Sequence, residues 1–369
     1  MILESGFKSD VKSASTNTRT TTRAWGLSTS TSHRVSRFIN FRKGISSMGQ
    51  YWTIFDLDNR ISLAWLGKLA EGLYAEYGCK SLIRFTLRPR PKNSSLVVGY
   101  LCGTKGLLKL PPELVYMILE LLDHFPDALA LVMTNKMLYN LGFTHIQQRL
   151  IKLQSPCAGS RLICLGDYSK NHDLPDAITK EDLEEIPIWQ KDHPNFSQED
   201  PFSYYAYASE TFSDVSPDSY SRCASSFVMV RFEWRERGKD YDSKGPWYKA
   251  LEDILKLETL NEEDLVLCNL TKREYADGAK AARRTKDEDL ACNISYMLGA
   301  ILKCRLCWSS DSSISISKDP YNISRGVWAG DRFEVTTKDR FMASIEKTQQ
   351  EWKDVTEEVV KEADAYWVW

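Results

Sequence analysis

Residues 107–141 read LLKLPPELVYMILELLDHFPDALALVMTNKMLYNL, and this stretch predicts a compact group of three helices. Pro112 can begin the first helix, because the first helical turn needs no backbone N–H at that position. Glu113 suits the positive end of the helix dipole. We predict that this first helix runs to about Leu122.

Two further helices are predicted to follow, the first of them short. The chain breaks before Phe125-Pro126, and Asp127 is predicted to cap a second helix over residues 128–134. A third helix is predicted from Lys136 onward.

The first of these helices is apolar on more than one side. Between Leu114 and Leu122 only Glu120 is charged. One apolar stripe is formed by Leu114, Ile118, Leu121 and Leu122. A second apolar face is formed by Val115 and Leu119. A unit of about 40 residues is too small to cover both sides. Either the rest of the chain or a partner protein must cover the second one.

These residues also carry a family resemblance. The pattern Leu110-Pro111-x-Glu113-Leu114, Ile118, Leu121-Leu122, Leu129-x-Leu131-Val132 and Asn135-Lys136 resembles the F-box. The resemblance implies a helical module whose apolar face docks on a Skp-type adaptor of a cullin–RING (SCF-type) ubiquitin ligase. It also implies an adaptor-binding face that includes Leu110, Pro111, Leu114, Ile118 and Leu122.

A second resemblance covers more of the chain. The sequence is similar to a group of fungal F-box-containing proteins in the segments Met48–Trp52, Arg161–Tyr168, Asp173–Pro175, Asn269–Tyr275 and Trp328–Phe333. This implies that residues 48–369 are one inherited unit. It also supports Met48 as an ancestral start.

Residues 1–47 differ in composition from the rest of the chain. They hold 17 Ser or Thr, eight Lys or Arg and only two acids. Such a segment buries too little apolar surface to offset the entropy of ordering it, so we predict disorder. A mitochondrial transit peptide would share this composition. A third alternative is that the extension is an artefact upstream of a true start at Met48.

Composition limits the classes of function. A formal net charge of −2 gives no general attraction to nucleic acid or anionic membrane. No stretch approaches the roughly 20 apolar residues of a membrane-spanning helix. Nine cysteines spread along the chain fit reduced thiols. We therefore expect an intracellular protein, cytoplasmic or nuclear, or mitochondrial if residues 1–47 are a transit peptide.

No motif predicts catalysis, a cofactor or a metal. Cys304 and Cys307 form a C-x-x-C pair, but a structural zinc site needs four ligands and no second pair lies near. We interpret them as two packed free cysteines. The sequence contains no nucleophile elbow and no glycine-rich phosphate loop. The chain is therefore predicted not to be an enzyme.

We predict an α+β protein in which a small helical F-box-like module is followed by a mixed α+β C-terminal domain. The predicted parts are residues 1–47, a small element and connector at 48–107, the F-box-like module at 108–150, and a target-binding domain at 151–369. Predicted strands cover residues 51–57, 96–100, 161–165, 227–234, 265–268 and 333–336. Predicted helices outside the module cover 64–77, 179–186, 247–257, 271–284 and 344–365, and residues 191–222 are predicted as a loop.

One loop is predicted to contact the target. Trp328-Ala329-Gly330-Asp331-Arg332 combines an aromatic residue, a glycine turn and two charges, a composition that suits a recognition tip. Trp328, Asp331 and Arg332 are its expected contact residues. The target itself is unknown.

Two other functions stay open at this point. In one, the protein is a non-catalytic interaction or structural protein, and the helical segment is ordinary core. That alternative predicts that the Leu114/Ile118 face is buried within the chain. In the other, the C-terminal domain is an enzyme of unrecognised class with a deep polar pocket.

Overall fold

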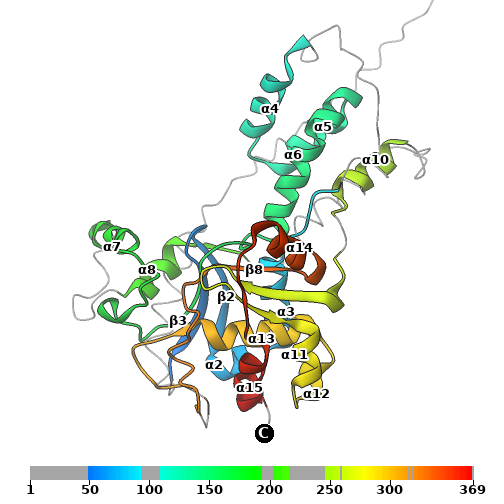
Figure 1. Cartoon of the computed structure of the whole chain (residues 1–369). Helices are drawn as coiled ribbons and strands as arrows, with labels where there is room; N and C mark the ends of the chain where they lie inside the picture. The colour runs from blue at the N-terminus through cyan, green and yellow to red at the C-terminus, as the bar shows by residue number, and fades with distance from the viewer. Residues whose placement is uncertain are drawn as a thin grey trace, which may run out of the picture. The chain divides into compact units, whose positions relative to one another are not determined.

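The computed structural model describes residues 49–92, 109–192, 203–215, 246–257, 260–314, 316 and 319–367. The fold is α+β, as predicted, with two mixed sheets and many helices (Figure 1). The predicted disordered segment 1–47 and the predicted strands 96–100 and 227–234 lie outside the described residues.

The first sheet joins segments that are far apart in the sequence. Its strand order is β4-β2-β1-β3-β7. β1 runs antiparallel to both β2 and β3, and β3 runs parallel to β7 with Cys164 opposite Cys307. The predicted element at 48–107 is therefore built into the same sheet as later residues. The strands are β1 (Tyr51–Asp56), β2 (Ile61–Lys68), β3 (Leu162–Gly166), β4 (Ser213–Asp214) and β7 (Cys307–Trp308).

The second sheet comes from the last third of the chain. Its order is β8-β5-β6-β9, with β5 antiparallel to β6 and β8. All five residues of β5 are buried, which explains its continuous apolar run. The strands are β5 (Leu265–Asn269), β6 (Glu274–Asp277), β8 (Phe333–Thr337) and β9 (Lys353–Asp354).

Helices lie between and after the strands along the chain. In the described residues up to 215 they are α2 (Leu69–Tyr74), α3 (Glu76–Thr86), α4 (Pro112–Leu121), α5 (Phe125–Met133), α6 (Lys136–Gln154), α7 (Lys180–Asp192) and α8 (Tyr204–Thr211). The later ones are α10 (Pro246–Leu255), α11 (Gly278–Arg284), α12 (Glu288–Ala291), α13 (Ile294–Leu306), α14 (Lys338–Thr348) and α15 (Thr356–Trp367).

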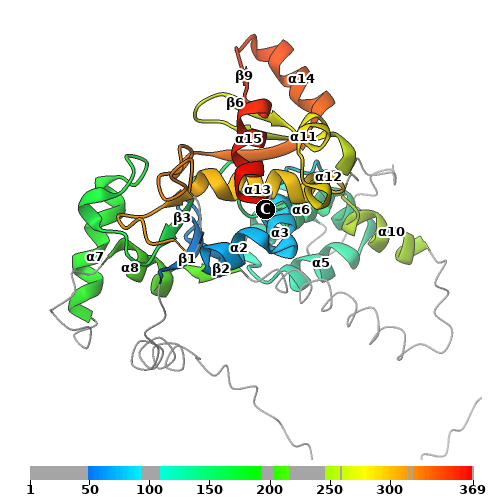
Figure 2. The same cartoon turned by 90° about the horizontal axis from the view of Figure 1, so that it is seen from below.

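Helix α13 is the centre of the largest core. Every residue from Ser295 to Leu306 is buried, and α3, α11 and α15 lie against it (Figure 2). Gly299 allows the closest of these contacts, because a Cβ there would lie 2.4 Å from the carbonyl oxygen of Cys79 in α3.

Helices α4, α5 and α6 form a separate hydrophobic cluster. Both α4 and α5 contact α6 (Figure 1). Helix α10 adds Ala250 and Ile254 to this cluster, and the Tyr139 hydroxyl donates to the Ala250 carbonyl at 3.1 Å. The side-chain amide of Gln147 extends this contact by donating to the Lys256 carbonyl at 3.1 Å.

The prediction of strands and helices is confirmed in many places and wrong in others. Residues 64–68 were predicted helical, but they belong to β2, whose backbone pairs with β1. Residues 274–277 were predicted helical and form β6. The predicted helix 344–365 is two helices, because α14 ends at Gln349 with a left-handed φ of 52°. The first two errors arise because strand pairing overrides local helical periodicity.

Two boundaries also need correction. The predicted loop 191–222 contains α8, whose Tyr204 and Tyr205 are buried against a third hydrophobic cluster. Helix α5 begins at Phe125 after His124, so Asp127 lies inside the first turn and does not cap it.

Candidate docking surface on helix α4

Helix α4 buries one side only. Val115 and Leu119 are 0% and 1% exposed, and they pack into the hydrophobic cluster of α5, α6 and α10. Four positions separate the two residues, so they lie on one line along the helix. This line is the inner face of α4.

A second side of α4 is apolar and largely exposed. The exposed fractions of Leu114, Met117 and Leu121 are 42%, 56% and 78%, and Ile118 is half-buried. Their spacing of i, i+3, i+4 and i+7 places all four on one stripe. We call Leu114, Met117, Ile118 and Leu121 the outer face of α4. A short helix with apolar residues on two sides suits contact with two different surfaces.

Charged groups border the outer face. Glu113 and Glu120 are exposed and lie seven residues apart, on one edge of the helix. Tyr116 is 39% exposed and lies on the far side of that edge. The outer face is therefore an apolar strip with an acidic margin.

The predicted adaptor-binding residues divide between the two sides. Leu114 and Ile118 lie on the outer face. Leu110 and Leu122 are half-buried and pack against the inner cluster, and Pro111 is exposed just before the helix begins. Met117 and Leu121 were not among the predicted site residues. Their spacing from Leu114 could have identified them once the inner face was assigned to Val115 and Leu119.

The C-terminal end of α4 is held by side chains of α6. The guanidinium of Arg149 donates to the carbonyls of Leu122 and Asp123, each at 2.5 Å, and to that of Leu119 at 3.5 Å. His145, one turn before Arg149, lies against the backbone of Leu119, and its pKa is lowered by burial and by Arg149. Sequence patterns did not identify either residue.

The predicted recognition loop has a different structure from the one expected. Trp328 is 0% exposed, so the prediction of an exposed aromatic tip is wrong. Its indole N–H donates to Glu274 at 2.7 Å, and the Arg305 guanidinium lies 4.7 Å from its ring centroid. The apolar ring is buried because α13 and β6 both supply polar partners for it.

Asp331 and Arg332 occupy contrasting environments. Asp331 is 8% exposed and accepts a hydrogen bond from Asn269 at 2.8 Å, and burial raises its pKa. The side chain of Arg332 is 47% exposed and pairs with Asp58 at 2.6 Å. Of the three predicted contact residues, Arg332 is the one with an accessible side chain.

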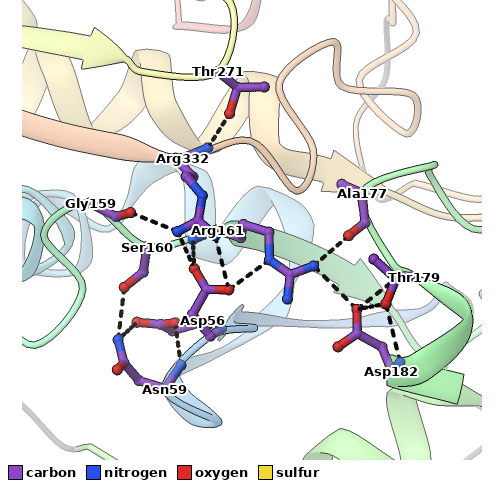
Figure 3. Close-up of polar contacts among 11 residues, drawn as sticks. Asp56, Asn59, Gly159, Ser160, Arg161, Ala177, Thr179, Asp182, Thr271 and Arg332 are labelled. Carbon is purple, nitrogen blue, oxygen red and sulfur yellow. Dashed lines mark hydrogen bonds and ion pairs between the residues drawn. The ribbon is translucent and has the colours of Figure 1, made fainter. Parts of the chain in front are cut away.

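Figure 3 shows the polar cluster around Arg332 and Arg161. Arg161 pairs with Asp58 at 2.7 Å and with Asp182 at 3.2 Å. Burial opposes ionisation of Asp58, but hydrogen bonds from Arg161 outweigh it and lower the pKa of Asp58. Asp58 bonds to both arginines, so these charges satisfy one another and tie the β1–β2 turn to two later loops.

The cysteine prediction is confirmed. Cys304 and Cys307 are buried free thiols, and burial raises the pKa of both. Within the described part of the chain, no three His, Cys, Asp or Glu side chains are grouped to hold a metal ion. None of the helices described is long and apolar enough to span a membrane. Comparison with protein-family models, with curated proteins and with solved structures finds no match to this chain.

Proposed function

We propose that this protein is an F-box-type adaptor that docks a Skp-type subunit of a cullin–RING ubiquitin ligase through the outer face of α4. In this proposal the chain catalyses no reaction. It holds a target protein near the ligase, which raises the local concentration of target lysines.

One observation carries this proposal. Leu114, Met117 and Leu121 expose 42%, 56% and 78% of their area on a helix whose inner face is anchored in a core. Contiguous exposed apolar residues of this kind mark interaction surfaces. An amphipathic helix face with i, i+3, i+4 and i+7 anchors is a recurring docking element. The F-box resemblance lies on the same helix.

The same observation weighs against the alternative that this segment is ordinary core. That alternative requires the Leu114/Ile118 face to be buried within the chain. Leu114 is 42% exposed, Met117 and Leu121 on the same stripe are 56% and 78% exposed, and Ile118 is half-buried. Among the described residues of α4, Val115 and Leu119 are the two that are fully buried.

The target-binding role is proposed for residues 151–369. Arg332 is the candidate contact residue that this proposal retains, because its side chain is 47% exposed. Trp328 would support the loop from within, since its ring is buried.

The test is the affinity of the full chain for a purified Skp-type adaptor, measured by calorimetry. The variant Leu114→Asp/Leu121→Asp places two charges on the outer face, at positions 42% and 78% exposed. We expect it to stay folded and to bind at least about tenfold more weakly, because desolvating a carboxylate at an apolar interface is costly.

A matched control makes the same chemical change elsewhere. Ile188→Asp/Met342→Asp replaces apolar residues that are 63% and 46% exposed on α7 and α14. We expect its affinity to equal that of the unmodified chain. Absence of adaptor binding by the unmodified chain, or equal losses in both variants, would refute the proposal.

A further inference from the structure

Helix α4 has no C-terminal cap of its own. The last four carbonyls of an α-helix have no partner within the helix. Many helices solve this with a glycine just beyond their end. Here the following residues are Leu122, Asp123 and His124, and the cap residue Leu122 has φ −84° and ψ 86°. The carbonyls at this end therefore need donors from outside the helix.

Arg149 of α6 supplies these donors. Its Nη1 donates to the carbonyls of Leu122 and Leu119, and its Nη2 donates to that of Asp123. A guanidinium suits this role, because its planar fork carries several N–H groups in fixed directions. Its positive charge also favours the negative end of the helix dipole.

The position of Arg149 connects all three helices. It belongs to α6, it bonds the end of α4, and its guanidinium lies 6.0 Å from the ring centroid of Phe125, the first residue of α5. One side chain therefore contacts the junction at which α4 passes into α5.

Helix α4 needs such support for two reasons. It has ten residues, a length at which isolated helices are marginal in water. It also buries only Val115 and Leu119 fully, so tertiary packing holds it along one line. Ile118 and Leu121 of the outer face lie in its last turn and a half, the part nearest to Arg149.

We propose that Arg149 is the positioning residue of the α4 docking surface. By bonding the carbonyl of the cap residue Leu122 and that of Asp123 just beyond it, with a longer contact of 3.5 Å to the Leu119 carbonyl inside the helix, it holds the last turns in helical form against α6 and orients Ile118 and Leu121 for the partner. This inference rests on the proposed function. Its structural half, that Arg149 keeps α4 ordered, is tested without any partner.

The first experiment is hydrogen–deuterium exchange of the full chain with Arg149→Ala. We expect amides of residues 116–122 to exchange about tenfold faster or more, the factor for losing one hydrogen bond to a charged group. Amides of α13 should keep their rate. Arg149→Lys should recover part of the protection, since an ammonium reaches one carbonyl but cannot span three. Lys152→Ala, which removes an exposed charge one turn later, should change neither helix.

The second experiment is adaptor affinity of the same variants. Arg149→Ala should bind about tenfold more weakly, because the partner must then order α4 on binding. Arg149→Lys should lie between it and the unmodified chain.

The outcomes separate the two proposals. Unchanged exchange in α4, or equal acceleration in α4 and α13, would overturn the role of Arg149. Faster exchange in α4 without adaptor binding by the unmodified chain would refute the proposed function and leave Arg149 as a support of α4 alone. Faster exchange with unchanged adaptor affinity would overturn the positioning role.

Discussion

Helices α4 and α13 are both built mainly from apolar residues, and the structure treats them in opposite ways. Helix α13 buries every residue from Ser295 to Leu306, including two charged ones. Helix α4 fully buries Val115 and Leu119 and leaves Leu121 78% exposed. Apolar composition alone therefore does not decide which helix lies in the core.

The difference comes from what surrounds each helix. Around α13, even the charges have partners: Lys303 donates to the Gly72 carbonyl at 2.7 Å, and Arg305 pairs with Glu362 at 2.7 Å. Buried charges are tolerated only with such partners. Around α4, the described chain covers one side. The described part of the chain thus leaves Leu114, Met117 and Leu121 of the outer face of α4 exposed.

The largest expected effect is the difference in stability between an aspartate placed in α13 and one placed on the outer face of α4. Leu298→Asp in α13 should lower the free energy of unfolding by about 4 kcal/mol or more, because Leu298 is 0% exposed and the substitution would bury a carboxylate in a hydrophobic cluster. Leu114→Asp in α4 should change it by less than about 1 kcal/mol. Urea unfolding followed by circular dichroism measures both. Similar losses would mean that the outer face is core.

A smaller effect should distinguish the two faces of α4 itself. Leu119→Ala should lower the free energy of unfolding by about 2–4 kcal/mol, since it leaves a cavity in the inner cluster. Leu121→Ala should change stability by less than about 0.5 kcal/mol and yet weaken adaptor binding. Urea titration measures the stability of both variants, and calorimetry measures their affinity for the adaptor. A Leu121→Ala variant that loses as much stability as Leu119→Ala would contradict the distinction between the two faces.

The smallest effect concerns pH at the end of α4. Burial and Arg149 lower the pKa of His145 in the folded state, and Glu120 and Lys152 also face it. A lowered folded pKa means that the neutral form supports the fold, so its contribution is present above the unfolded value of about 6.5 and is lost below it. The buried Nε2 of His145 has no hydrogen-bond partner within the described chain. Protonation would therefore bury an unpaired N–H, which further disfavours the charged form.

We therefore expect α4 amides to exchange a few-fold faster, relative to α13 amides, as the pH falls from 7.5 to 5.5 after correction for intrinsic rates. His145→Gln should flatten this dependence. A dependence that survives the substitution would assign the titration to another group.

Much of the fold could be predicted from the sequence because many elements are locally encoded. The apolar runs at Leu162–Gly166 and Leu265–Asn269 are buried strands, and prolines mark the starts of α4 and α5. Asn135 caps α6 by accepting a hydrogen bond from the Met137 backbone at 2.7 Å. Each of these depends on neighbours in the chain.

The errors fall where a distant partner decides. Residues 64–68 were predicted as the start of a helix, but they pair with the backbone of β1. Trp328 follows residues typical of a loop, but its indole N–H bonds to Glu274 and its ring stacks with Arg305, and both partners are distant in the sequence. Arg149 lies 27 residues from the carbonyl of Leu122 that it caps. No local period in a sequence encodes such contacts.

The order in which the first sheet is assembled has a consequence for biosynthesis. Strand β1 spans residues 51–56, whereas β7, at the far edge beyond β3, spans residues 307–308. A nascent chain that has not yet emerged past residue 308 therefore presents β3 with an unpaired edge, a hazard for aggregation. Helices α4 to α6 make contacts that are close in sequence and can form on the ribosome long before that. Helix α4 can thus meet α5 and α6 before the first sheet is complete, although α10 joins their hydrophobic cluster only later.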